Sequence, residues 1–75
     1  MNYLIEQING FNYEKPAFKK EFKTFGRAKS FGLKLLRKSL STGLDCAVFL
    51  YSFNGENLMQ KFEIYSNGKL DEYNI

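Results

Sequence analysis

The sequence contains no histidine, no tryptophan, one cysteine and one proline. Histidine is the usual acid–base group near neutral pH and the commonest metal ligand, so its absence removes both roles. Cys46 alone can form neither a disulfide within the chain nor a cysteine-rich zinc site. Glycine-rich phosphate loops are also missing, and the carboxylates occur singly except at Asp71 and Glu72. We therefore expect a protein that is not an enzyme and that binds no metal or cofactor.

The sequence also lacks a long apolar run. The longest run, residues 46–51, is far shorter than the roughly 20 residues that cross a bilayer. The first eight residues include Glu6 and do not resemble an export signal. A lone cysteine is typical of a reducing compartment. We expect no membrane contact and a cytoplasmic location.

Aromatic residues are abundant in this short chain. Eight Phe and five Tyr occur among 75 residues, a length that predicts one compact domain over residues 1–75. Each aromatic ring can bury roughly 150–250 Å², and a chain this short needs large side chains to offset the entropy of folding. Most of the aromatics are therefore expected in the core.

Charge is segregated along the chain. Residues 1–14 carry a net charge of −2, residues 15–38 of +8 and residues 39–75 of −3, which together give the +3 of the whole. Such asymmetry is typical of proteins that contact nucleic acid or an acidic partner. The alternative is that oppositely charged segments simply neighbour each other across the fold.

Hydrophobic periodicity predicts one helix and five strands. Thr24 is a suitable N-cap for a helix over residues 25–40, and Gly43 follows its end. Asn-Gly pairs at 54–55 and 67–68 indicate hairpins. The predicted fold is α+β, a single helix packed on a four- to five-stranded antiparallel sheet in the order β-β-α-β-β-β. The predicted strands are residues 3–8, 18–22, 44–53, 58–65 and 70–73.

Gly32 lies on the apolar stripe of the predicted helix. Glycine costs a helix roughly 1 kcal/mol relative to alanine. At this position the absence of a side chain is expected to let the helix approach the sheet closely.

The hairpin at 54–55 leaves two registers open, and they place the aromatic rings differently. A two-residue loop puts Phe49 on the same face as Phe62. A loop one residue longer, with a shifted pair, puts Leu50 there instead.

In either register, one helix covers one face of the sheet, while the strand at 44–53 is apolar on both faces. Its second face therefore needs another cover. The loop over residues 9–17, with Phe11 and Tyr13, is one candidate, and a second copy of the chain, forming a homodimer, is the other.

Two groups of residues are candidates for binding. Cations on the polar side of the helix and just before it suit phosphates or an acidic protein surface: Lys23, Arg27, Lys34, Arg37 and Lys38. Aromatic residues of the uncovered sheet face suit a protein partner or the bases of a nucleic acid: Tyr51, Phe53 and Tyr65. The simpler interpretation of any single lysine is a solvated surface residue.

The chain resembles small accessory proteins of bacteriophages and mobile elements, among which are anti-CRISPR proteins and other inhibitors of host defence. The shared features are a content rich in Lys, Asn and Phe, nine Lys against two Arg, and a β-β-α-β-β-β pattern without catalytic groups. Residues 22–31 (FKTFGRAKSF) look like the strand-to-helix junction of such domains. The resemblance covers the whole chain but rests on no diagnostic motif, and it transfers no site residue. Acidic DNA-mimicking inhibitors differ, because the middle of this chain is basic.

The leading hypothesis is a non-catalytic binding protein. The resemblance implies a phage-encoded inhibitor, in the cytoplasm of the bacterial host, that occupies a surface of a defence protein or nucleoprotein complex such as CRISPR–Cas. The alternative is a small nucleic-acid-binding module that uses the basic helix face.

Overall fold

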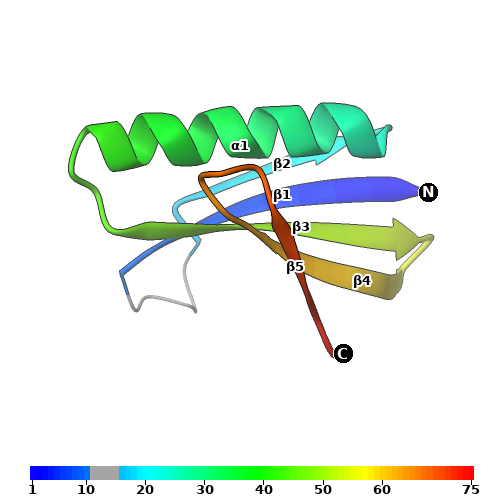
Figure 1. The fold of residues 1–75 in the computed structure, drawn as a ribbon. Coiled ribbons are helices and arrows are strands. Elements are labelled where there is room, and N and C mark those ends of the chain that lie inside the picture. The colour runs from blue at the N-terminus through cyan, green and yellow to red at the C-terminus, as the bar shows by residue number, and fades with distance from the viewer. Residues whose placement is uncertain (11–15) are drawn as a thin grey trace.

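The computed structural model, described here for residues 1–10 and 16–75, has one helix lying across one face of a five-stranded antiparallel sheet (Figure 1). The predicted α+β fold and its order of elements are confirmed. The strand order in the sheet is β2-β1-β3-β4-β5. The elements are β1 (Asn2–Asn9), β2 (Phe18–Phe22), α1 (Phe25–Ser41), β3 (Cys46–Asn54), β4 (Asn57–Ile64) and β5 (Leu70–Tyr73).

Local signals define the ends of α1. The Oγ1 of Thr24 accepts a hydrogen bond from the backbone N–H of Arg27 at 3.3 Å, which is the N-cap arrangement that the sequence predicts. At the other end, the N–H of Gly43 donates to the carbonyl of Leu40, and Gly43 has a φ of +81°. A residue with a side chain is strained at such an angle, so glycine suits this helix end.

The core lies between α1 and the three central strands. Ile5, Leu50 and Ile64 meet there at 0–1% exposure, and Val48 and Ala28 complete the buried centre. Gln7 is also buried, and its amide donates to the side chains of Asn9 and Ser39. Within the described residues, no buried side-chain polar atom lacks a hydrogen-bond partner.

Gly32 lies where α1 crosses this core. A Cβ at position 32 would lie 2.5 Å from Cδ1 of Ile64 and 2.9 Å from Cδ1 of Ile5. These distances are shorter than any van der Waals contact, so the helix backbone reaches the sheet because position 32 has no side chain. The predicted close approach is confirmed.

The hairpin between β3 and β4 has the pairing of faces of the second register, but it reaches this pairing through a two-residue turn and a bulge, and the predicted longer loop is wrong. Asn54 pairs with Asn57, and an irregularity between Ser52 and Phe53 shifts the pairing so that Leu50 faces Phe62. The register that put Phe49 beside Phe62 is wrong, because a β-bulge adds one residue to β4 and reverses the faces. Val48 and Leu50 therefore face the helix.

The opposite face of the sheet, which we call the open face, has no helix over it (Figure 1). The prediction that the loop over residues 9–17 covers this face depends on Phe11 and Tyr13, which lie outside the described residues. The strand pairings place on the open face Leu4, Glu6, Ile8, Lys19, Glu21, Ala47, Phe49, Tyr51, Phe53, Lys61, Glu63, Asp71 and Tyr73.

Candidate functional site

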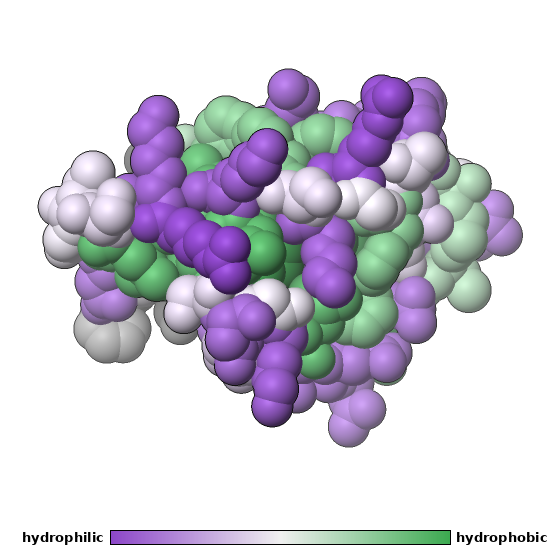
Figure 2. Space-filling view, turned by 45° about the horizontal axis from the view of Figure 1, so that its top comes forward, coloured by the Kyte–Doolittle hydropathy of each residue, from purple (hydrophilic) through white to green (hydrophobic). Residues whose placement is uncertain are grey.

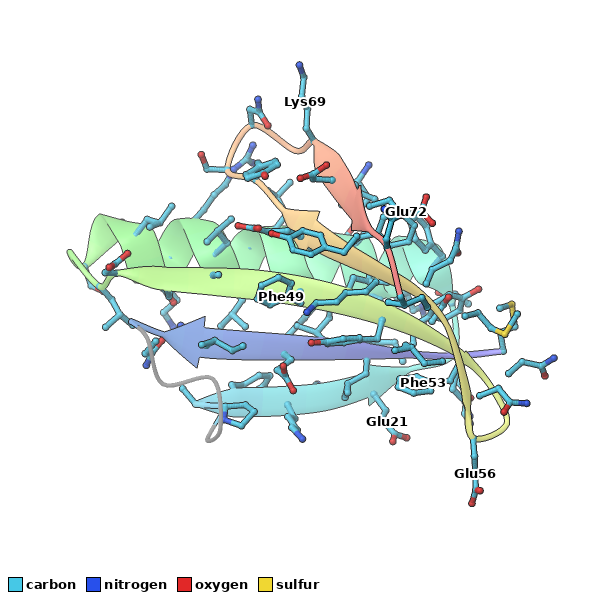
Figure 3. The ribbon with its side chains drawn as sticks, turned by 90° about the horizontal axis from the view of Figure 1, so that it is seen from below. Glu21, Phe49, Phe53, Glu56, Lys69 and Glu72 are labelled. Carbon is cyan, nitrogen blue, oxygen red and sulfur yellow. The ribbon has the colours of Figure 1, made fainter. Side chains whose placement is uncertain are left out.

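The open face is partly covered by its own side chains. Lys61 projects from β4 onto this face, and its ammonium lies over three aromatic rings, 4.7 Å from the centroid of Phe49, 5.2 Å from Tyr73 and 5.7 Å from Tyr51. The ring of Tyr73 also meets Phe49 edge to face at 5.9 Å. As a result Phe49 is only 5% exposed, although no helix covers it (Figure 3).

Two phenols of this face are held by carboxylates. The hydroxyl of Tyr51 donates to Glu6 at 3.0 Å, and the hydroxyl of Tyr73 donates to Glu63. Burial, followed by the hydrogen bond to Glu6, raises the pKa of Tyr51 above its usual value. The hydrogen bond to Glu63, followed by desolvation, raises the pKa of Tyr73 to about 12. Both phenols stay protonated, as donors, at pH values where a free tyrosine ionises.

These raised pKa values predict a loss of stability at alkaline pH. Between pH 10 and about 12, the unfolded chain loses protons that folded Tyr73 keeps, so the free energy of unfolding falls as the pH rises through this range. Below pH 10 the stabilisation is fully present. Urea unfolding at pH 8 and pH 11 is expected to show a smaller alkaline loss in the double variant Tyr51→Phe/Tyr73→Phe than in the wild type. Equal losses would contradict the prediction.

The second surface is an open groove of about 660 Å³ between α1 and the edge strand β2. Phe22 and Phe31 form its apolar floor, with ring centroids 5.1 Å apart. Arg27 and Lys34 line it from the helix, and the ammonium of Lys20 lies 5.0 Å from the centroid of Phe31. We call this surface the basic groove. Figure 2 shows hydrophilic side chains standing along the helix side, with hydrophobic surface between them.

The structure brings together part of the predicted basic set. Lys23 lines an adjoining hollow with Arg27 and donates to the side chain of Asn2. Lys38 is exposed one helical turn beyond Lys34 and extends the basic surface. Arg37 is directed elsewhere, because its Nε donates to the carbonyl of Ser66 in the turn between β4 and β5, at 3.0 Å.

The predicted aromatic set is divided as well. Tyr51 and Phe53 are neighbours, with ring centroids 6.4 Å apart. Phe53 also lines a separate hollow of about 320 Å³ together with Glu21 and Glu56; these three residues are labelled in Figure 3. Tyr65 stands apart, at the end of β4, and donates to Asp71.

Lys61 and Tyr73 belong to the open face but were not among its predicted members. Their alternation with Phe62 and Glu72 was visible in the sequence, but the face they occupy depends on the bulge in β4. Once the pairing of Tyr51 with Lys61 is known, the alternation of side chains along a strand assigns both Lys61 and Tyr73 to the open face.

The two faces differ in charge. On the open face, the carboxylates of Glu6, Glu21, Glu63 and Asp71 outnumber the ammonium groups of Lys19 and Lys61. On the helix side the cations predominate: Lys20, Lys23, Arg27, Lys29, Lys34, Arg37 and Lys38. The segregation along the sequence therefore becomes a segregation between two surfaces.

A scan with protein-family models, a search of curated proteins and a search of solved structures each found no match to this chain. The geometry defines it as an α+β domain with a basic groove on the helix side and a self-covered aromatic face on the other. Within the described residues, no three His, Cys, Asp or Glu side chains gather closely enough to hold a metal ion. No helix in the same part of the chain is long and apolar enough to traverse a bilayer.

Proposed function

We propose that this chain is a non-catalytic binding protein that uses its basic groove to occupy an acidic surface of a partner. The single observation that carries the proposal is the uncompensated charge of the groove. Among residues 1–10 and 16–75, the one ion pair joins Lys19 to Glu6, on the open face. The cations of the groove are therefore available to an external anion, and the floor of Phe22 and Phe31 offers apolar contact beside them.

The partner that we propose is a bacterial defence protein or nucleoprotein complex, such as CRISPR–Cas, with the chain acting as a phage-encoded inhibitor. The small size, the composition and the lack of histidine support this setting. A basic groove suits steric blocking of an acidic protein surface. Its cations attract the carboxylates of such a surface and repel the cations of a basic one.

A nucleic-acid-binding module is the second candidate, since cations beside aromatic rings are also what single strands bind. Stacking needs a ring with a free face. In the groove, Phe22 and Phe31 are half-buried and packed against each other, and the ammonium of Lys20 lies over both rings. This packing favours the protein partner.

The double reversal Arg27→Glu/Lys34→Glu is expected to weaken capture of the defence complex roughly a hundredfold, because like-charge contacts cost several kcal/mol. The matched control is Lys29→Glu/Lys69→Glu, which changes the net charge equally at residues that do not line the basic groove. Titration of the purified defence complex measures the affinity of both variants. Inhibition is measured as the survival of phage in cells whose defence system targets that phage. Equal loss in both variants would contradict a role for the groove.

Nuclease treatment and salt separate the two candidate functions. A protein partner is expected to stay bound after nuclease treatment of the complex. Direct binding of nucleic acid would instead show an affinity that falls linearly with the logarithm of salt concentration and a slope that Arg27→Glu/Lys34→Glu reduces. That second result would replace the protein partner with the nucleic-acid module.

A further inference from the structure

The outer edge of β2 is the feature that carries a further inference. β2 stands at one end of the sheet, pairs with β1 on one side, and has no strand on its other side within the described residues. The backbone groups along a free edge can pair with another strand. The sequence of β2 is Phe-Lys-Lys-Glu-Phe, which is close to symmetric about its central residue, Lys20.

Two copies of this strand can pair antiparallel about a two-fold axis perpendicular to the sheet. With the axis at Lys20, Phe18 faces Phe22 of the second copy, and Lys19 faces Glu21 of the second copy. Each of these pairs occurs twice, because a two-fold interface is self-complementary. The phenylalanines meet on the helix side and the opposite charges meet on the open face, in agreement with the face that each residue already occupies.

The charges select this register over its neighbours. A shift of one residue would pair side chains from opposite faces, which the symmetry forbids. The next allowed registers set Glu21 against its own copy or Lys19 against its own copy, and like charges directly opposite each other are destabilising. In the selected register, Lys19 would lie between Glu6 of its own chain, already at 3.7 Å, and Glu21 of the second copy.

The opposite edge of the sheet lacks this property. β5 has the sequence Leu-Asp-Glu-Tyr. The two symmetric registers that pair its middle residues set Asp71 against Asp71 or Glu72 against Glu72, which disfavours pairing. Self-complementarity therefore distinguishes β2 from β5.

We propose that two copies of this chain join edge to edge through β2 and form one continuous sheet, with both helices on the same side. The unfavourable contact is Lys20 against Lys20 at the axis. The repulsion between the two ammonium groups is reduced because each lies over rings of its own chain, 5.0 Å from the centroid of Phe31 and 5.6 Å from that of Phe22. The two basic grooves would flank the axis. The dimer is independent of the identity of the partner proposed above.

This dimer can be tested by exchanging the charges of Lys19 and Glu21 and measuring the dimer dissociation constant by sedimentation equilibrium. Each single variant, Lys19→Glu or Glu21→Lys, sets two like-charge pairs across the axis and is expected to weaken dimerisation about tenfold or more. The double variant Lys19→Glu/Glu21→Lys restores opposite charges and should recover most of that loss. Lys69→Glu, an exposed change away from β2, should leave dimerisation unchanged. Circular dichroism would confirm that every variant is folded.

Lys20→Thr provides a test in the opposite direction. It removes the like charges at the axis and places a residue with high strand propensity there, so dimerisation should strengthen. A monomer at every concentration in both the wild type and Lys20→Thr would overturn the proposal. A dimer that Phe53→Ser abolishes and Glu21→Lys leaves intact would overturn it as well, because the interface would then lie on the open face.

Discussion

Replacing Gly32 with leucine should lower the free energy of unfolding by about 3 kcal/mol, at the upper end of the usual cost of overpacking a core. The added Cβ alone would lie 2.5 Å from Ile64 and 2.9 Å from Ile5, whose side chains are almost fully buried. Both near atoms are the Cδ1 ends of side chains, which can rotate, but the further atoms of a leucine also have to enter this buried core, which requires new rotamers or a shift of α1. Improved helix propensity returns only about 1 kcal/mol. Urea unfolding at 25 °C measures the difference.

Gly26 offers a matched control in the same helix. Nothing lies within 4 Å of a Cβ built at Gly26, so Gly26→Leu should leave the stability unchanged or slightly raised. Ile64→Val removes the methyl group nearest to position 32. Gly32→Ala should therefore be less destabilising in the Ile64→Val background than in the wild type, a coupling that a double-mutant cycle detects. Equal effects of leucine at positions 26 and 32 would contradict the close approach.

The elements of this fold could be predicted because their signals are local. Thr24 and Gly43 mark the two ends of the helix through hydrogen bonds to residues within four positions. Gly32 could be interpreted for the same reason, since its place on the apolar stripe follows from the helical period alone. The order of the strands in the sheet depends on contacts between distant segments, and no local signal in this sequence specifies it.

The register of the β3–β4 hairpin could not be decided from the sequence. Gly55 has a φ of +62°, but Asn54 has no positive φ and pairs with Asn57, so the turn is centred on Gly55 and Glu56, one residue beyond the Asn-Gly pair that the sequence predicts. The irregularity between Ser52 and Phe53 lies outside the turn, in residues that carry no distinctive signal. One extra residue there determines whether Phe49 or Leu50 faces the helix, so the sequence alone is compatible with both alternatives.

The basic set of the candidate site could be predicted only in part. Arg27, Lys34 and Lys38 share a helix face, and the helical period places them together. Arg37 flanks that face in the helical period, but its partner is the backbone carbonyl of Ser66, 29 positions later in the chain. Such a contact follows from tertiary packing and has no counterpart in the local pattern.

Lys61 is expected to be the most important polar residue of the open face for stability. Lys61→Glu should lower the free energy of unfolding by about 3 kcal/mol, because a desolvated cation–π contact is worth about 2 kcal/mol and the new carboxylate would face ring surfaces that repel it. Lys61 is half-buried and lies over three rings, which supports a value near the desolvated limit. Chemical denaturation at pH 7 measures the change.

Two variants separate the causes of this loss. Lys61→Met keeps the apolar stem over Phe49 and replaces the ammonium with a thioether, whose own contact with the rings offsets part of the lost cation–π energy, so it should cost about 1 kcal/mol. Lys69→Glu makes the same change of charge at an exposed turn, where substitutions usually stay within about 0.5 kcal/mol. If Lys61→Glu were no worse than Lys69→Glu, the ammonium would not be covering the rings. The open face would then be an exposed aromatic surface, and it, rather than the basic groove, would be the first place to seek a partner.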